Sequence, residues 1–126
     1  MAVQFFCVFI GGGIGSALRF LITLFSRKIF VHSVYGTLTC NLVGCFLIGV
    51  TAVLFTQKTG IFSYIPKPLV VTGFFGGLTT FSTFNLEAFS MLSEGRIFQG
   101  VLYIFASVLL GLLCTYAGFR LAGGLY

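Results

Sequence analysis

Long apolar segments alternate with short polar segments along this chain of 126 residues. The apolar segments cover residues 3–25, 35–55, 69–92 and 97–122. Because a helix rises about 1.5 Å per residue, each segment is long enough to cross a hydrocarbon core of about 30 Å. The pattern therefore predicts an all-α integral membrane protein with four transmembrane helices, in a single transmembrane domain that covers residues 1–126.

The polar residues between these segments predict short loops at residues 26–28, 57–68 and 93–96. An even number of spans places both termini on one side of the membrane. The basic residues of the two faces balance, three against three: Lys58, Lys67 and Arg120 on one side, and Arg27, Lys28 and Arg96 on the other. Orientation follows an imbalance of such residues, so this balance favours insertion both ways and an antiparallel, dual-topology dimer.

The composition argues against several classes of function. Hydrophobic residues make up 58% of the chain and charged residues 7%, so little remains outside the bilayer to fold a soluble catalytic module. The seven basic residues form no patch, which argues against nucleic acid as a partner. The four cysteines lie in apolar runs without metal-ligand spacing, and the single histidine, His32, lies in a predicted loop. We therefore expect no enzyme activity.

Two polar residues lie inside the first two spans. Arg19 is costly in lipid, so it faces a cavity or extends to an interface; beside a cavity it attracts anions. Asn41 lies one helical turn after Thr37, on the same face of the second span. The Asn41 amide either bonds a neighbouring helix or donates to a passing anion.

The third span contains the most informative stretch, residues 73–87. Paired glycines followed by hydroxyl residues disfavour a continuous helix, so we predict a break between Gly76 and Thr80, in mid-membrane. Carbonyls freed by such a break can coordinate a cation, and two copies meeting at a dimer axis can enclose one ion.

Aromatic and acidic side chains follow the predicted break. Phe81 and Phe84 are three residues apart and share one face; they are lipid or core contacts, or their positive ring edges approach an anion. Glu87 is the only carboxylate inside a span. It is a proton or cation site, or a structural partner of Arg19 or of a helix end, and we favour the structural role.

Small residues recur in the fourth and first spans. Tyr103, Ser107, Gly111 and Thr115 follow one another every four residues, which is typical of close helix packing and also offers a polar track. The glycine cluster at residues 11–16 has neither a preceding strand nor a following lysine, so we interpret it as helix packing rather than nucleotide binding.

Three motifs together resemble one family. The run Gly-Gly-Leu-Thr-Thr-Phe-Ser-Thr-Phe at residues 76–84, with Glu87 beyond it, is similar to the signature of the Fluc (CrcB) fluoride channels. Residues 12–20 and 36–42 match further landmarks of that family, in order, so the resemblance covers essentially the whole chain.

The resemblance implies a passive, highly selective fluoride channel that exports cytoplasmic fluoride and confers fluoride resistance. It also implies a multi-pass protein in the lipid bilayer of the bacterial cytoplasmic (inner) membrane. The implied assembly is an antiparallel homodimer with two pores. A structural Na+ at the dimer interface is held by backbone carbonyls, which map to Gly76 and Thr79.

The resemblance also assigns side chains. It places Arg19 in a vestibule and the aromatic pair Phe81 and Phe84 in the fluoride pore, and it leaves Glu87 as a structural polar residue. The other expected pore positions are Thr37, Asn41, Ser82, Thr83, Tyr103, Ser107 and Gly111. Some family members carry a hydroxyl where this chain has Gly111.

Two alternatives remain at this point. A small proton-coupled multidrug exporter is also a four-helix dimer, but it needs an intramembrane carboxylate in its first span, and only Glu87 in the third span is available here. A non-transporting assembly subunit would use the phenylalanines and small residues for packing, and would leave the hydroxyl-rich break unexplained.

Overall fold

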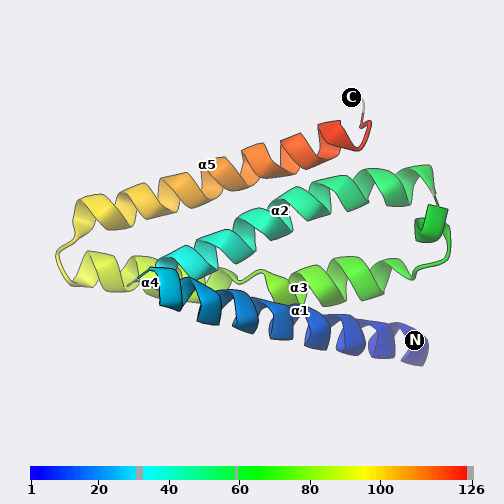
Figure 1. Cartoon of the computed structure of the whole chain (residues 1–126), viewed down its shortest axis with the longest axis horizontal. Coiled ribbons are helices and arrows are strands. Elements are labelled where there is room, and N and C mark those ends of the chain that lie inside the picture. The colour runs from blue at the N-terminus through cyan, green and yellow to red at the C-terminus, as the bar shows by residue number, and fades with distance from the viewer. Residues whose placement is uncertain (31–32, 59, 125–126) are drawn as a thin grey trace.

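The computed structural model describes residues 1–30, 33–58 and 60–124, and every secondary-structure element in these ranges is a helix. The spans are α1 (Ala2–Ile29), α2 (Val34–Gln57), a divided third span, and α5 (Ile97–Leu121). The third span consists of η2 (Pro68–Phe75), α3 (Gly76–Leu78) and α4 (Phe81–Ser93), and a 3-10 turn, η1 (Gly60–Ser63), precedes it. The start of α1 and the end of α5 lie at the same end of the bundle (Figure 1).

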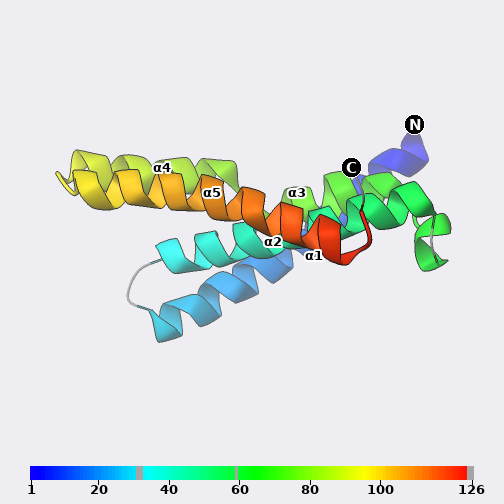
Figure 2. The ribbon, with the colours of Figure 1, turned by 90° about the horizontal axis from the view of Figure 1, so that it is seen from above.

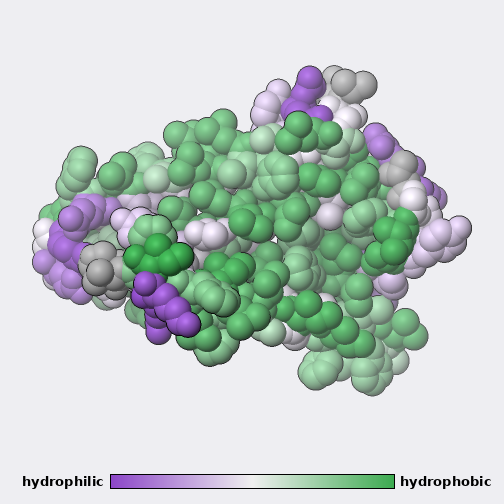
Figure 3. All heavy atoms as spheres, viewed as in Figure 1, coloured by the Kyte–Doolittle hydropathy of each residue, from purple (hydrophilic) through white to green (hydrophobic). Residues whose placement is uncertain are grey.

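Four helical spans of the described residues are long and apolar enough to cross a membrane, which confirms the predicted fold class. On the face that Figure 3 shows, the middle of the molecule is apolar, and hydrophilic residues gather toward its two ends. The buried core is small and centres on Phe84, Ala88, Met91 and Tyr103, while many large apolar side chains are exposed. This is the surface of a multi-pass membrane protein, whose outer solvent is lipid. His32 lies outside the described residues.

The loop prediction is wrong at the end of the first span. Arg27 and Lys28 belong to the last turn of α1. Cations are favourable there because the helix dipole places negative charge at that end, and long basic side chains can reach polar surroundings from a buried stem. The Lys28 ammonium also lies 5.7 Å from the centre of the Phe25 ring. Gln57 is likewise helical, as the last residue of α2, and the residue that follows it, Lys58, has a left-handed φ of 48°.

Glycines bring the spans into backbone contact. A Cβ added to Gly11 or Gly15 of α1 would overlap the carbonyl oxygen of Leu69 or Phe74 in the third span. Gly49 of α2 and Gly118 of α5 face each other's helices in the same way. These contacts confirm the predicted close packing of the glycine cluster and of the small residues of the fourth span.

The third span breaks in mid-membrane, as predicted, but over a shorter stretch. Thr79 (φ −87°, ψ 160°) and Thr80 (φ −151°, ψ 117°) are extended, whereas Gly76 and Gly77 remain helical. The hydroxyl residues therefore end the helix, not the glycines. The Thr80 hydroxyl accepts a bond from the backbone N–H of Thr83 at 3.3 Å and so caps α4.

The break changes the neighbours of the third span. η2 and α3 pack against α1, whereas α4 packs against α5 and α2. Within the described chain α4 makes no close backbone contact with α1. Figure 2 shows α4 and α5 diverging from α1 and the start of α2. This divergence opens one side of the bundle beside the break.

Candidate functional site

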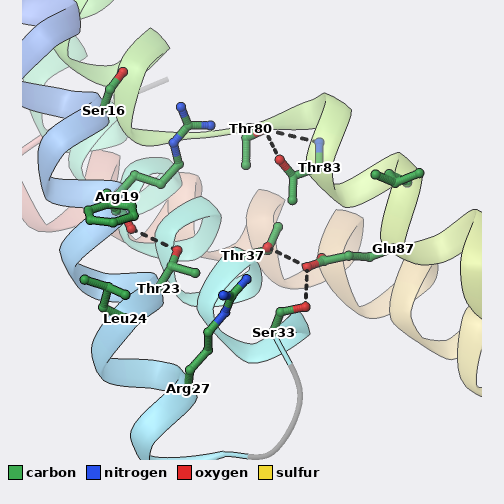
Figure 4. Close-up of a pocket in the computed structure, with 12 residues that line it drawn as sticks. Ser16, Arg19, Thr23, Leu24, Arg27, Ser33, Thr37, Thr80, Thr83 and Glu87 are labelled. Atoms are coloured by element: carbon green, nitrogen blue, oxygen red, sulfur yellow. Dashed lines mark hydrogen bonds between the residues drawn. The ribbon is translucent and has the colours of Figure 1, made fainter.

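Two cavities meet at the break. The first, here called the vestibule, has a volume of about 600 Å³ and is lined mainly by α1 and α4, with the start of α2 (Figure 4). Its polar lining includes Arg19, Thr23, Arg27, Thr37, Thr83 and Glu87. The second, here called the aromatic cavity, has a volume of about 310 Å³ and includes Asn41, Thr79, Phe81, Phe84 and Ser107 in its lining. Thr80 lines both cavities.

Asn41 holds the backbone of the break. Its Oδ1 accepts the N–H of Thr80 at 2.8 Å, and its Nδ2 donates to the carbonyl of Thr80 at 3.2 Å. The extended Thr80 peptide has left the helical hydrogen-bond ladder, so its two polar groups need partners inside the protein. The first of the two roles expected for the Asn41 amide, a bond to a neighbouring span, is therefore present. Asn41 also lines the aromatic cavity.

Thr80 is a residue that the candidate list from the sequence omitted. Its hydroxyl donates to the Thr83 hydroxyl at 3.0 Å and lies 3.4 Å from that of Ser82. These hydroxyls form a short polar run where the vestibule meets the aromatic cavity. A sequence signal existed: threonine is among the residues preferred at a helix N-cap, and Thr80 directly precedes the segment that continues the span after the predicted break.

Glu87 accepts hydrogen bonds from three hydroxyls. Ser33, just before α2, and Thr37, near the start of α2, donate to Oε1 at 3.2 and 3.0 Å. Tyr103 of α5 donates to Oε2 at 2.9 Å. The carboxylate thus joins three spans, as a structural residue would. The suggested pairing with Arg19 is wrong: both residues are described, and no ion pair joins them. Hydroxyls from α2 and α5 reach the carboxylate instead.

Ser33 also was missed by the sequence reasoning. It lies one helical turn before Thr37, which lies one turn before Asn41, so the signal was a polar stripe with a spacing of four residues. The same spacing joins Arg19, Thr23 and Arg27 on α1.

Arg19 lines the vestibule, so it faces a cavity, one of the two placements expected. The Thr23 hydroxyl donates to the Arg19 carbonyl at 2.9 Å. Figure 4 shows the Arg19 side chain extending from α1 toward the side of the cavity where Thr80 lies. The guanidinium therefore places positive charge near the break.

The aromatic pair is asymmetric. The rings of Phe81 and Phe84 lie 5.9 Å apart, tilted by 39°. Phe84 is buried, with 8% of its surface exposed, and packs against the Tyr103 ring at 5.2 Å, whereas Phe81 is 78% exposed. The Ser107 hydroxyl oxygen is buried without a hydrogen-bond partner in the described structure, and Ser107 lines the aromatic cavity with both rings.

Four of the expected site residues line neither cavity. Tyr103 is buried and contacts both the Phe84 ring and the Glu87 carboxylate. Gly111 faces Cys45, whose sulfur would lie 3.4 Å from a Cβ added to the glycine. Gly76 and Ser82 are exposed on the third span. A direct contact between a transported ion and these four residues requires more than one chain, or a rearrangement.

Backbone groups are the better candidates for metal ligands. No cluster of three or more His, Cys, Asp or Glu side chains occurs in the described residues. The end of α3 leaves carbonyls without their usual partners, because the N–H of Thr80 bonds Asn41. Gly76 is exposed, and a Cβ added to it would meet no atom within 4 Å.

Known proteins resemble this chain over most of its length. A family model described as CrcB-like protein, Camphor Resistance (CrcB), matches residues 6–119. The chain belongs to the CrcB family. The fluoride-specific ion channel FluC of Rhizobium etli is 42% identical over 117 residues, covering 92% of this chain and 93% of that protein.

Two further CrcB-family relatives are similar over most of their length. The fluoride-specific ion channel FluC of Chlorobium phaeobacteroides is 41% identical over 116 residues, covering 89% of this chain and 87% of that protein. The protein of the same name from Escherichia coli K12 is 44% identical over 102 residues, covering 81% of this chain and 80% of that protein. The family model, which matches residues 6–119, reaches into all four spans rather than a single motif.

Proposed function

We propose that this chain forms a passive, highly selective fluoride channel that exports cytoplasmic fluoride and confers fluoride resistance. The relatives named above are fluoride-specific ion channels, which supports the ion assignment. The observation that carries the mechanism is the broken third span, whose Thr80 peptide is held by Asn41 between a vestibule containing arginine and a cavity containing two phenylalanines.

Fluoride enters the vestibule, where Arg19 lowers the cost of bringing an anion below the membrane surface. The Thr83 hydroxyl, which accepts the hydrogen of the Thr80 hydroxyl, can then donate its own hydrogen to the ion in place of water. In the aromatic cavity the positive ring edges of Phe81 and Phe84 approach the ion, and the unpartnered Ser107 hydroxyl can donate to it. An inside-negative potential drives the anion outward with about 2.3 kcal/mol per charge per 100 mV.

The proposed assembly is an antiparallel homodimer with two pores in the bacterial cytoplasmic (inner) membrane. The balance of three basic residues on each face supports dual topology. The exposure of Phe81 and Gly76 beside the break supports a second copy on that side. Each copy then supplies groups that a single chain leaves facing lipid.

A structural Na+ between the two copies fits the residues present. The carbonyls of Gly76 and Thr79 flank the end of α3, and Gly76 is open to an incoming group. Oxygen ligands suit a hard cation, and the bound ion would supply positive charge that offsets the carbonyls of two facing breaks.

The test is ion efflux from liposomes containing the purified protein, with potassium and valinomycin to cancel the membrane potential. We expect rapid efflux of fluoride and none of chloride, compared with protein-free liposomes. Equal flux of both anions, or no fluoride flux from a monodisperse protein, would remove the assignment. Proton-driven export of an organic cation would then favour the multidrug exporter, with Glu87 as its carboxylate.

Dual topology has its own test. A cysteine placed at Ser93, the exposed last residue of α4, is labelled in intact cells by a maleimide that cannot cross the membrane, on a background without native cysteines. We expect about half of the protein to be labelled from outside and the rest only after permeabilisation. Complete labelling, or none, from outside would contradict the antiparallel arrangement.

A further inference from the structure

We propose that Arg27 is a second anion-capturing residue, which makes the vestibule net positive and feeds fluoride toward Arg19. This inference rests on the proposed channel function. Arg19 and Arg27 line the same cavity from α1. They are eight residues apart, which places Arg27 about 12 Å farther along the helix, toward its C-terminal end.

The net charge of the vestibule lining depends on Arg27. The charged residues of the vestibule are Arg19, Arg27 and Glu87, so its formal charge is two minus one, or +1. Without Arg27 it is one minus one, or zero. A cleft of one sign concentrates ions of the other sign and raises their rate of entry. Arg27 therefore determines whether the vestibule attracts anions before they reach Arg19.

Both guanidinium groups are available for this role. Neither arginine forms an ion pair in the described part of the chain, where the carboxylate of Glu94 pairs with Arg96 and that of Glu87 accepts three hydroxyl bonds. Figure 4 shows both arginine side chains extending from α1 into the cavity. Arg27 is exposed, whereas Arg19 is half-buried, so an ion from bulk water meets Arg27 first.

Lys28 provides a matched control because it carries the same charge one residue away. Its ammonium lies over the Phe25 ring, and Lys28 is absent from the vestibule lining. Successive residues of a helix point about 100° apart, so the two side chains leave α1 in different directions. A general effect of positive charge at this membrane surface would involve both residues, whereas capture by the vestibule involves Arg27 alone.

The experiment compares fluoride efflux by the unmodified protein, Arg27→Gln, Arg27→Lys and Lys28→Gln at ionic strengths of about 10 mM and about 1 M, where the screening length falls from about 30 Å to about 3 Å. A non-permeant salt sets the ionic strength. We expect Arg27→Gln to lower the initial rate about threefold at low ionic strength. The difference should largely vanish at high ionic strength, and Arg27→Lys and Lys28→Gln should retain nearly the full rate.

A misfolded variant would lose flux at both ionic strengths, so the salt dependence separates charge from folding, and gel filtration checks the assembly. Equal losses in Arg27→Gln and Lys28→Gln, or a loss independent of salt, would overturn the inference while leaving the channel assignment intact. An unmodified protein that carries no fluoride would instead overturn the channel assignment, and this inference with it.

Discussion

Asn41 of α2 bonds both polar groups of the Thr80 peptide, through Oδ1 at 2.8 Å and Nδ2 at 3.2 Å. The break of the third span is thus fixed by a side chain 39 residues earlier in the sequence. Thr80 in turn lines both cavities. The position of α2 therefore controls the point at which the two cavities meet.

Replacing Asn41 by leucine, which has a similar shape, should destabilise the protein and slow fluoride efflux. The substitution removes both side-chain bonds and leaves the N–H and carbonyl of Thr80 without partners, at a cost of about 1–3 kcal/mol for each buried group. The midpoint of thermal unfolding in detergent and the efflux rate measure the two effects.

Asn85→Leu is the control for Asn41→Leu. Asn85 is exposed on α4, and its Nδ2 donates only within its own helix, to the Phe81 carbonyl at 2.9 Å. We expect little loss of stability, because that carbonyl keeps its place in the helix. Equal destabilisation by the two substitutions would show that the bonds to Thr80 carry no special weight.

The bond between Tyr103 and Glu87 should give measurable coupling. Tyr103→Phe removes the hydroxyl that donates to Oε2 and keeps the ring beside Phe84. Glu87→Gln removes the charge of the acceptor. Hydrogen bonds to charged groups contribute about 1.5–3 kcal/mol, so a double-mutant cycle on unfolding free energies should show coupling of about 1 kcal/mol or more.

Tyr116→Phe serves as the comparison in that cycle. Tyr116 is on the same helix, and its side chain is 55% exposed. Its combination with Glu87→Gln should be additive within about 0.5 kcal/mol, because the two positions share no contact. Additivity of Tyr103→Phe with Glu87→Gln would mean that the carboxylate does not depend on this hydroxyl.

Gly15→Ala should be strongly destabilising, whereas Gly13→Ala should not. A methyl group at Gly15 would overlap the Phe74 carbonyl and come within 2.8 Å of the Leu78 nitrogen, forcing α1 away from the third span. At Gly13 an added Cβ meets nothing within 4 Å, and alanine favours the helix by about 1 kcal/mol. The amount of monodisperse protein in detergent and its unfolding midpoint measure both. Similar stability of the two variants would exclude the close backbone contact.

The spans were predictable from the sequence because their signal is local. Runs of more than twenty apolar residues specify membrane helices whatever their neighbours are. The ends of the spans are less predictable: the polar residues Arg27 and Lys28 predict a loop, but they lie in the last turn of α1, where cations are favourable. Composition predicts the break, but its position at Thr79 and Thr80 depends on the packing of Gly73 and Gly77 against α1.

The contacts of the candidate site could be predicted only in part. The polar residues of each span were visible in the sequence, but their partners lie 16 to 54 residues away. Charge suggests Arg19 as one of the partners of Glu87, beside a helix end, whereas the fold places three hydroxyls around the carboxylate. Thr80, Ser33 and Arg27 were overlooked because a hydroxyl or a terminal cation gains meaning only when a cavity lies beside it.

Substitution of Phe84 should mainly affect folding, whereas substitution of Phe81 should mainly affect fluoride conduction. Phe84 belongs to the buried cluster with Tyr103 and Met91, so Phe84→Ala should cost about 3–5 kcal/mol of unfolding free energy, as large-to-small core substitutions do. Phe81 is largely exposed on a single chain, so Phe81→Ala should leave the fold of that chain intact and still slow fluoride efflux, because its ring lines the aromatic cavity. Phe89→Ala, at another exposed ring of α4, should affect neither property.

Unfolding in detergent and efflux from liposomes are measured on the same preparations. A Phe81→Ala protein that conducts at the full rate would remove this ring from the ion path, and the fluoride route would then have to bypass the aromatic cavity.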